Sequence, residues 1–522
     1  MKDRIKKIML LSLFMSAAMT AFGASYHLDS HSGSDQNDGL SPKKAWATLK
    51  KANLVTFKKG DQILLKRGSV FLGKLALKSV AASKAEPLLI DAYGVDKKLP
   101  RIDAPGYIAG ITIEECSYVD VKNLEITSDG GKVIDVQAEK ERYGVYISQS
   151  RNVSVDNLNV HSIFATTQTK SEGKNGTTAY GHGIRFDDSQ SVRVSNCIIK
   201  RVGRYGINGK RSKNIEILTN KTDHTGCSGL QLGHCNDVLV QDNLFDHPGS
   251  SIDKRMHARG SGSWVFGCNN VLYERNWFLN AKGKADSCGI HIDFNCKNVV
   301  VQYCFSMNNE GGFVEILGNN HNCAYRYNIS VNDGFRKKGK GGAHQEGKVL
   351  WLSGYCGRKK KRSGPFNSYI YNNTIYVKKG EQPSFSISPT TRGALVANNI
   401  FHILGETRNV IGDQKIYKKT NSKARDIVFE NNVYIHNSIL PTGLGVKDKR
   451  PILGDSGFIN SGGKVPRDYT PTNAKLLKDK SMKITKILGD KIGITIGFDM
   501  RKDFFGSPIK GIPDIGAIEL KE

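Results

Sequence analysis

Three copies of one short pattern follow each other at equal distances: Gly183-Ile184-Arg185-Phe186, Gly206-Ile207-Asn208 and Gly229-Leu230-Gln231-Leu232. Their leading glycines are 23 residues apart, a period that is typical of solenoids and too short for a propeller blade. Each copy alternates apolar and other residues, which predicts a short strand. The sequence therefore indicates that one turn of a coil is repeated along the chain.

The repeat extends in both directions, to Gly144-Val145-Tyr146-Ile147 and to Gly289-Ile290-His291-Ile292. A second strand begins nine residues after each of the first four glycines, at Val153, Val192, Ile215 and Val238. Four or five residues further on stands an asparagine, and the series is Asn157, Asn196, Asn220, Asn243, Asn276, Asn328, Asn398 and Asn431, with Cys304 replacing one member. Stacked turns would bring these amides above one another and let them hydrogen-bond along the coil.

A second column holds small side chains at another corner of the turn. It consists of Cys116, Ser150, Ser189, Ser212, Cys235, Cys268 and Cys296. Since most of the ten cysteines occupy such repeat positions, we expect buried thiols rather than a disulfide framework. A single disulfide among Cys235, Cys268 and Cys296 stays open, because they fall on successive turns.

This pattern resembles the right-handed parallel β-helix proteins, which include secreted polysaccharide lyases and some glycoside hydrolases, and it is most similar to the lyases. Residues 35–49, DQNDGLSPKKAWATL, look like the N-terminal motif of such proteins, and residues 513–519, PDIGAIE, look like their closing segment. The resemblance implies an all-β solenoid that is capped at its N-terminus. We expect a signal peptide at 1–23, the cap and first turns at 24–99, the β-helix at 100–440 and a C-terminal closing segment at 441–522.

The N-terminus carries the features of an export signal. Basic residues precede an apolar run at 8–14, and Ala21-Phe22-Gly23 forms a cleavage site, so the mature chain should begin at Ala24 or Ser25 in a secreted or periplasmic protein. No later apolar stretch is long enough for stable membrane insertion. The composition, 39% hydrophobic and 24% charged, excludes a disordered chain. The sequence does not indicate an oligomeric state.

The formal charge of +27 points to a polyanionic partner. For an exported protein we expect this partner to be an acidic polysaccharide and not nucleic acid. Ten basic residues between 336 and 362 fit the charge density of a sulfated glycosaminoglycan better than that of pectin.

One outward-facing column emerges from the first strands of the repeat, namely Tyr146, Arg185, Asn208, Gln231, Trp264, His291 and Glu315. The step from Gly229 to Gly262 takes 33 residues instead of 23, so residues 246–261 form an inserted loop before the strand of Trp264. This loop carries Lys254, Arg255, His257 and Arg259. It should project beside His291, Asp293 and Glu315, and loops on a rigid scaffold commonly hold catalytic groups.

These groups suggest β-elimination as the reaction. A lyase that acts on uronic acid needs a base and a neutraliser for the developing charge, and Lys, Arg and His fill both roles. We therefore predict a polysaccharide lyase that cleaves an acidic, uronic-acid-containing glycan, with or without sulfate. The predicted catalytic residues are Lys254, His257, Arg259, His291 and Glu315. The predicted substrate-binding residues are Arg185, His224, Arg255, Trp264, Asp293 and Arg336.

Two alternatives remain open. A β-helix glycoside hydrolase would need two carboxylates about 5–9 Å apart, and Asp293 with Glu315 is the only pair that the repeat places so. A non-catalytic carbohydrate-binding or surface protein would also explain a charged cleft. The sequence has no zinc-ligand spacing. Calcium is an open cofactor, because some β-helix lyases use it on the uronate carboxylate, and scattered acids such as Asp187 and Asp188 would have to bind it.

Overall fold

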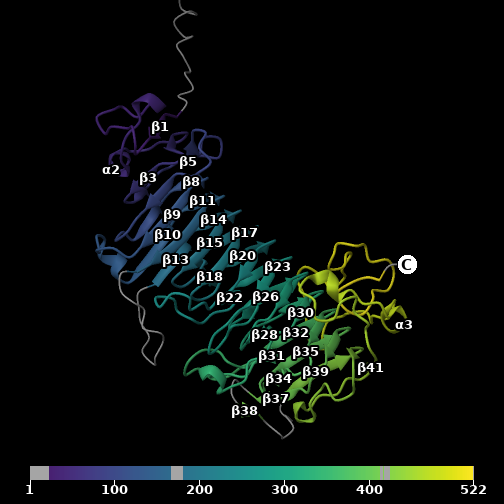
Figure 1. Ribbon diagram of the computed structural model, residues 1–522. Helices are drawn as coiled ribbons and strands as arrows, with labels where there is room; N and C mark the ends of the chain where they lie inside the picture. The colour runs from purple at the N-terminus through teal and green to yellow at the C-terminus, as the bar shows by residue number, and fades with distance from the viewer. Residues whose placement is uncertain (1–22, 166–179, 412–414, 417–423, 521–522) are drawn as a thin grey trace, which may run out of the picture.

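The computed structural model describes residues 23–165, 180–411, 415–416 and 424–520. Three long sheets run side by side along one axis, and their strands are parallel except for the last strand of one sheet, which is antiparallel to its neighbour (Figure 1). We call these sheets A, B and C, and the strands of each are given below. Within a turn the chain passes from sheet C to sheet A, then to sheet B, and returns to sheet C one turn further on. The predicted all-β parallel β-helix is confirmed.

The strands and short helices have the following bounds. Sheet A holds β1 Ser25–Leu28, β2 Gln62–Lys66, β5 Leu88–Tyr93, β8 Ser117–Lys122, β11 Arg151–Asp156, β14 Gln190–Ser195, β17 Lys213–Leu218, β20 Asn236–Gln241, β23 Asn269–Glu274, β26 Lys297–Gln302, β29 Ala324–Arg326, β32 Phe366–Tyr371, β35 Arg392–Ala397 and β39 Arg425–Glu430. Sheet B holds β3 Val70–Leu72, β6 Arg101–Asp103, β9 Glu125–Asp129, β12 Asn159–Phe164, β15 Ile198–Val202, β18 Lys221–Thr225, β21 Leu244–Asp246, β24 Trp277–Leu279, β27 Phe305–Met307, β30 Ile329–Val331, β33 Thr374–Val377, β36 Ile400–Ile403, β40 Val433–Tyr434 and β41 Ile452–Leu453. Sheet C holds β4 Leu75–Lys78, β7 Ala109–Glu114, β10 Glu141–Ser148, β13 Tyr180–Asp187, β16 Ile207–Lys210, β19 Leu230–Gly233, β22 Ser263–Phe266, β25 Ile290–Ile292, β28 Gly312–Ile316, β31 Lys348–Leu352, β34 Ser384–Ile387, β37 Arg408–Ile411 and β38 Lys415–Ile416. The helices are η1 Pro42–Lys44, α2 Leu49–Ala52, η2 Val136–Glu139, η3 Lys340–Gly342, η4 Thr442–Leu444, η5 Pro466–Tyr469 and α3 Ala474–Leu477.

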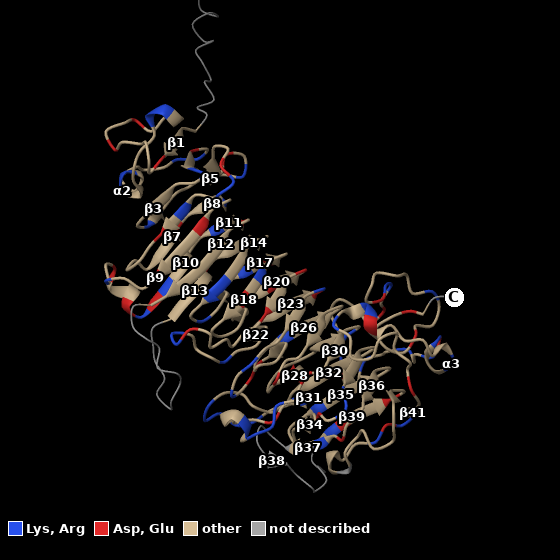
Figure 2. Ribbon diagram, in the orientation of Figure 1, with Lys and Arg blue, Asp and Glu red and all other residues tan. Residues whose placement is uncertain are grey.

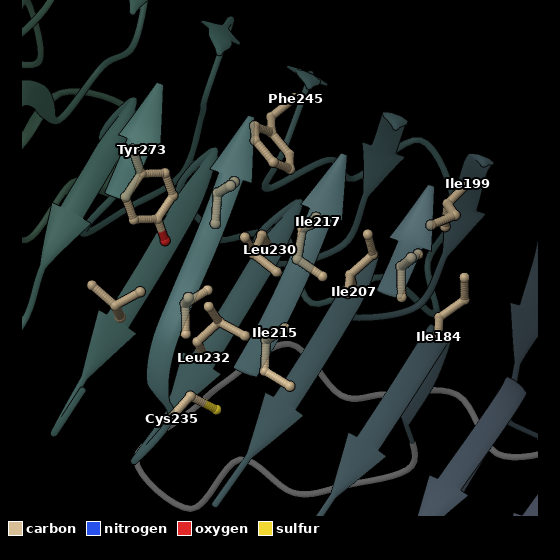
Figure 3. Packing of buried hydrophobic residues seen from close by; sticks show 14 of the residues in the cluster. Ile184, Ile199, Ile207, Ile215, Ile217, Leu230, Leu232, Cys235, Phe245 and Tyr273 are labelled. Atoms are coloured by element: carbon tan, nitrogen blue, oxygen red, sulfur yellow. The ribbon is translucent and has the colours of Figure 1, made fainter. Parts of the chain in front are cut away.

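The interior of the coil is filled by aliphatic side chains that stack in rows. Ile184, Ile207 and Leu230 are paired in register on β13, β16 and β19, and all three are fully buried (Figure 3). The glycines before them lie where sheets B and C meet. A Cβ at Gly183 would stand 2.4 Å from Cγ2 of Ile199, so the close approach of the two sheets requires glycine here.

The asparagine series divides into two adjacent columns. Asn220, Asn243 and Asn276 are buried, and Oδ1 of each accepts hydrogen bonds from the turn before it; Asn220 Nδ2 donates to Asn243 Oδ1 over 3.0 Å. Asn157 and Asn196 instead lie one position earlier and are exposed, with φ of 51° and 53°. Our prediction that all four stack in one ladder is thus wrong for Asn157 and Asn196. Their backbone is in the left-handed region, which asparagine adopts more readily than most residues that have a side chain.

The corner of small side chains is as predicted. The backbone N–H of Ser150 donates to Ser189 Oγ over 3.1 Å, and that of Cys235 donates to Cys268 Sγ over 3.3 Å. All ten cysteines lie among the described residues, are free, and nine of them are buried. The predicted buried thiols are confirmed.

The two terminal segments cover different parts of the coil. Near the N-terminus Trp46 is 3% exposed and donates from Nε1 to the carbonyl of Asn37 over 2.9 Å, beside the helix α2. Residues 454–520 run back along the side of the last turns (Figure 1). Their apolar residues pack on the outer faces of sheets A and B, as Ile484 and Ile515 do, so these sheets are apolar on both faces there.

We expect Asn243→Ala to lower the free energy of unfolding by about 2–4 kcal/mol, because buried backbone groups of two turns lose their partners. Asn157→Gly, which removes an exposed amide and keeps the positive φ, should cost less than about 1 kcal/mol. Chemical denaturation followed by circular dichroism measures both. Equal losses for the two variants would contradict the division into a buried and an exposed column.

Candidate active site

The predicted outward column is present in sheet C. Strand register pairs Tyr146 with Arg185, Asn208, Gln231, Trp264 and His291 in sequence, and the pairing of Ile292 with Ile316 puts Glu315 next to His291. Regular strand pairing therefore fixes which side chains are neighbours on this face.

The loops that lead from sheet B to sheet C lie along one edge of this face. The loops at 247–262 and 280–289 enclose a pocket of about 240 Å³ together with residues of the preceding turns. Its walls are formed by Arg204, Tyr205, Cys227, Ser228, His257, Arg259, Gly260, Ser261, Trp264, Asp286 and His291. The inserted loop thus lines a pocket beside His291, as we expected.

His291 is surrounded by acidic groups. Its Nε2 lies 3.5 Å from Glu315 Oε1 and 3.7 Å from Asp293 Oδ1, and the three side chains are buried. Burial opposes the imidazolium charge, but Glu315, Asp293 and Asp286 outweigh it and raise the pKa of His291 to about 10. Burial also raises the pKa of Glu315, to about 7, and the charge of His291 counters part of that rise.

The two nearest carboxylates are held by neutral donors. Cys288 Sγ donates to Glu315 Oε2 over 2.6 Å, and Trp264 Nε1 donates to Asp293 Oδ2 over 2.9 Å. Trp264 lines the pocket, whereas Glu315 lies behind His291 and is only 1% exposed. Asp293 therefore lies against the wall residues Trp264 and His291, and Glu315 contacts His291 alone among the residues of the wall.

A third carboxylate, Asp286, belongs to the pocket wall. Arg259 donates to its Oδ2 from Nε over 3.0 Å and from Nη2 over 2.6 Å. Burial alone would raise the pKa of Asp286, yet the charges of Arg259 and His291 lower it below its usual value. Arg336 holds the backbone of this segment by donating from Nη1 to the carbonyl of Asp286 over 2.9 Å.

The opposite wall is aromatic and cationic. The guanidinium carbon of Arg204 lies 3.9 Å from the ring centre of Tyr180 and 4.7 Å from that of Tyr205. His257 packs edge-on against Tyr180 with ring centres 5.8 Å apart. Aromatic faces and planar cations of this kind suit the apolar and hydroxyl-bearing faces of a sugar.

Several residues that we predicted for the site do come together. His257, Arg259, Trp264 and His291 line the pocket, and Asp293 and Glu315 contact His291.

Other predicted residues lie apart from the pocket. Lys254 is exposed on the inserted loop. Arg255 pairs with Asp253 over 2.8 Å and also with Asp129, and Arg185 pairs with Asp187 over 2.8 Å. His224 stacks on His247 at the end of β18 in sheet B, with ring centres 4.5 Å apart.

The sequence analysis missed Asp286, Arg204 and Tyr205. Asp286 falls in a sheet B to sheet C loop outside the repeat, so no register could place it. Tyr205 directly precedes Gly206 and lines the pocket. The residue before each repeat glycine occupies the same place in its turn, so counting back one residue from the glycines was the signal that could have found Tyr205.

Among the described residues, no group of three or more acidic, histidine or cysteine side chains offers the oxygen ligands that calcium needs. Two such groups bring their ligand atoms within 4.8 Å of one another, Asp223 with His224 and His247, and Cys288 with His291 and Glu315. Both contain imidazole nitrogen, whereas calcium prefers oxygen ligands alone.

The fold class is now defined, and comparisons with known proteins add to it. The family model of the right handed beta helix region matches residues 109–255 and 143–330. A curated relative, the lacto-N-biosidase of Bifidobacterium longum subsp. longum, is 25% identical over an alignment that covers 97% of this chain and 37% of the relative. The chain thus spans little more than a third of that relative's length.

Solved structures agree on the architecture. The GH136 lacto-N-biosidase from Eubacterium ramulus matches as a selenomethionine derivative and as the native protein, with 22% identity and a TM-score of 0.53 in both. The alignments cover 75% and 74% of this chain and 68% of that protein. This likeness establishes the shared parallel β-helix fold.

The predicted polysaccharide lyase is wrong. The relative whose sequence aligns with nearly the whole chain is a lacto-N-biosidase, which is a glycoside hydrolase. The error has a physical reason: we assigned the chemistry from the basic groups of the inserted loop, but Lys254 is exposed, and Arg255 and Arg259 pair with carboxylates.

No helix among the described residues has the length and apolar character needed to cross a membrane.

We expect the thermal stability of the protein to fall between about pH 6.5 and 10 through His291, because the folded state keeps this proton up to about pH 10 and an unfolded histidine only up to about 6.5. The stabilisation is complete below the unfolded pKa and is lost as the pH rises through the folded pKa. Glu315 acts in the same direction at lower pH, between about 4.5 and 7.

Melting temperatures of the wild type and of His291→Gln across this range measure the effect. The advantage of the wild type should shrink steadily with rising pH. The exposed His31→Gln serves as the control and should run parallel to the wild type. A constant gap between wild type and His291→Gln would show that His291 carries no extra proton in the folded protein.

Proposed function

We propose that the protein is a glycoside hydrolase and that Asp286 and Asp293 are its two catalytic carboxyl groups. The observation that carries the proposal is a pocket with Asp286 in its wall and Asp293 against its wall residues Trp264 and His291, on a chain that aligns over 97% of its length with a lacto-N-biosidase. Glycosidic bond hydrolysis needs one carboxyl as acid and one carboxylate as nucleophile or base.

Asp286 suits the role of the carboxylate. Arg259 and His291 lower its pKa, so it is ionised at neutral pH and can attack the anomeric carbon or take a proton from water. Asp293 would then donate a proton to the departing glycosidic oxygen. The neighbouring His291 holds a proton, and its Nε2 lies 3.7 Å from Asp293 Oδ1, so it can resupply Asp293.

The remaining groups position these two. Arg259 fixes Oδ2 of Asp286 with two hydrogen bonds, and the indole N–H of Trp264 fixes Asp293. Glu315 acts through His291 and is a positioning residue, not the catalytic partner of Asp293 that the sequence suggested. Arg204, Tyr205 and His257 offer a sugar the stacking surface and the donors of a binding subsite.

The substrate class follows from the relative's name, and we take a glycan that contains lacto-N-biose as the first substrate to test. We expect Asp286→Asn to reduce kcat on this glycan and on its aryl glycoside alike, by about 100- to 10,000-fold. Asp293→Asn should show a similar loss on the glycan and a much smaller one on an aryl glycoside with a good leaving group, which departs without protonation. Product release followed by chromatography measures both.

Two variants serve as controls. Glu216→Gln removes an exposed carboxylate on sheet A, and Lys254→Ala removes the exposed lysine of the inserted loop. Both should keep wild-type rates. Full activity of Asp286→Asn would reject the assignment, and appearance of an unsaturated product would reject hydrolysis itself.

We also propose that the protein is exported. The basic start, the apolar run at 8–14 and Ala21-Phe22-Gly23 support it, and residues 1–22 lie outside the described part of the chain. The test is N-terminal sequencing of the protein recovered outside the cytoplasm, which should begin at Ala24 or Ser25. A chain that begins at Met1 would contradict the proposal.

A further inference from the structure

A second pocket adjoins the catalytic one along the same edge of the coil. It has a volume of about 580 Å³ and is lined by Gly283, Lys284, Glu310, Phe335, Arg336, Lys337, Lys340, Gly341, Ala343, Gly380 and Glu381. These residues come from four successive loops that lead from sheet B to sheet C, at 280–289, 308–311, 332–347 and 378–383. The catalytic pocket is built from the loops before them and shares the loop at 280–289.

The shared loop joins the two pockets closely. Gly283 lines the second pocket and Asp286 the first, so at most about 10 Å of backbone separates them. Arg336 locks this stretch by donating from Nη1 to the carbonyls of both Gly283 and Asp286, over 3.2 and 2.9 Å. An oligosaccharide bound with its cleaved linkage at Asp286 would therefore have its neighbouring sugars within about 10 Å of the second pocket.

The second pocket has an excess of uncommitted positive charge. Within the described part of the chain Lys284, Lys337 and Lys340 form no ion pair with a carboxylate. The two acids of the pocket are engaged otherwise, because Glu310 Oε2 accepts from the backbone N–H of Gly283 over 3.1 Å and Glu381 faces Lys378 at 3.9 Å. Lysine and arginine positions flank η3 in this loop (Figure 2).

The shape of the pocket keeps this charge accessible. A Cβ on Gly342 would stand 3.3 Å from Cε and 3.7 Å from Nζ of Lys284, so glycine leaves room for that ammonium beside the loop. Gly341 is in the left-handed region with φ of 61°, and no atom of the described residues lies within 4 Å of a Cβ built on it, so it leaves this side of the pocket open. Half-buried Phe335 adds an aromatic face of the kind that packs against sugar rings.

We propose that this basic pocket is a substrate subsite for an anionic substituent, a sulfate ester or a carboxylate, on a sugar next to the one that is cleaved. The proposal rests on the proposed hydrolase and deepens it, since it assigns the enzyme an acidic oligosaccharide as its preferred substrate. Three ammonium groups that lack acidic partners act together on a single anion, so their attractions add. This attraction weakens as the salt concentration rises.

The test compares three forms of one lacto-N-biose-containing oligosaccharide: neutral, sulfated and sialylated on a neighbouring sugar. The wild type should bind and cleave at least one anionic form about tenfold better than the neutral form at low salt, a difference of about 1.4 kcal/mol. The form that gains tells whether a sulfate or a carboxylate is recognised. Binding is measured by calorimetry on Asp286→Asn, and cleavage by kcat/KM on the enzyme with its carboxylates intact.

The variant Lys284→Ala/Lys337→Ala/Lys340→Ala should lose this advantage and keep the wild-type kcat/KM for the neutral form. The matched control, Lys43→Ala/Lys44→Ala/Lys50→Ala, removes the same charge at the exposed N-terminal cap and should keep the advantage. Equal treatment of neutral and anionic forms by the wild type, or equal losses in both triple variants, would overturn the subsite.

Failure of the proposed hydrolase gives a different result. If none of the three forms is cleaved but an anionic form still binds through the three lysines, the hydrolase is rejected and the anionic subsite stands.

Discussion

The stacking of each turn on the next in register is the constraint on which this structure depends. At the corner after sheet A, the amide of Asn243 receives the backbone and side-chain N–H groups of Asn220 and donates to Asn276 in turn. A turn that slipped by one residue would leave these buried groups without partners and would bring a Cβ against the neighbouring sheet at Gly183 or Gly206. The same register sets His291 between Asp293 and Glu315, so the site inherits its precision from the coil.

The sequence repeat alone predicted the features that the register of the turns determines. The outward column from Tyr146 to Glu315 and the stack of serines and cysteines both follow from counting residues between glycines. The spacing in the sequence also contained the division of the asparagines. Counted from the first residue of the predicted strand, Asn157 and Asn196 come four residues later, whereas Asn220 and Asn243 come five residues later. We read both offsets as one position, whereas a difference of one residue separates a buried amide from an exposed left-handed one.

Residues in the loops between sheets B and C could not be placed in this way. Asp286 and Lys254 both lie outside the repeat, and only tertiary packing turns the first into the pocket and the second to solvent. The class of reaction was equally beyond the sequence pattern, because one scaffold carries lyases and hydrolases and the choice depends on a few loop side chains. Basic residues in the sequence suggested elimination, but their carboxylate partners became visible only in three dimensions.

The buried cysteines set a condition on how the chain must fold. Burial raises the pKa of thiols such as Cys296 and Cys323, so in the finished coil they are neutral and unreactive. Each thiol gains this protection only when the adjoining turn has formed, and until then stacked positions such as Cys235 and Cys268 are open to cross-linking. In an oxidising medium the yield of native protein therefore depends on whether the turns stack faster than the exposed thiols are oxidised. Once the coil is complete, its buried thiols stay reduced without an added reductant.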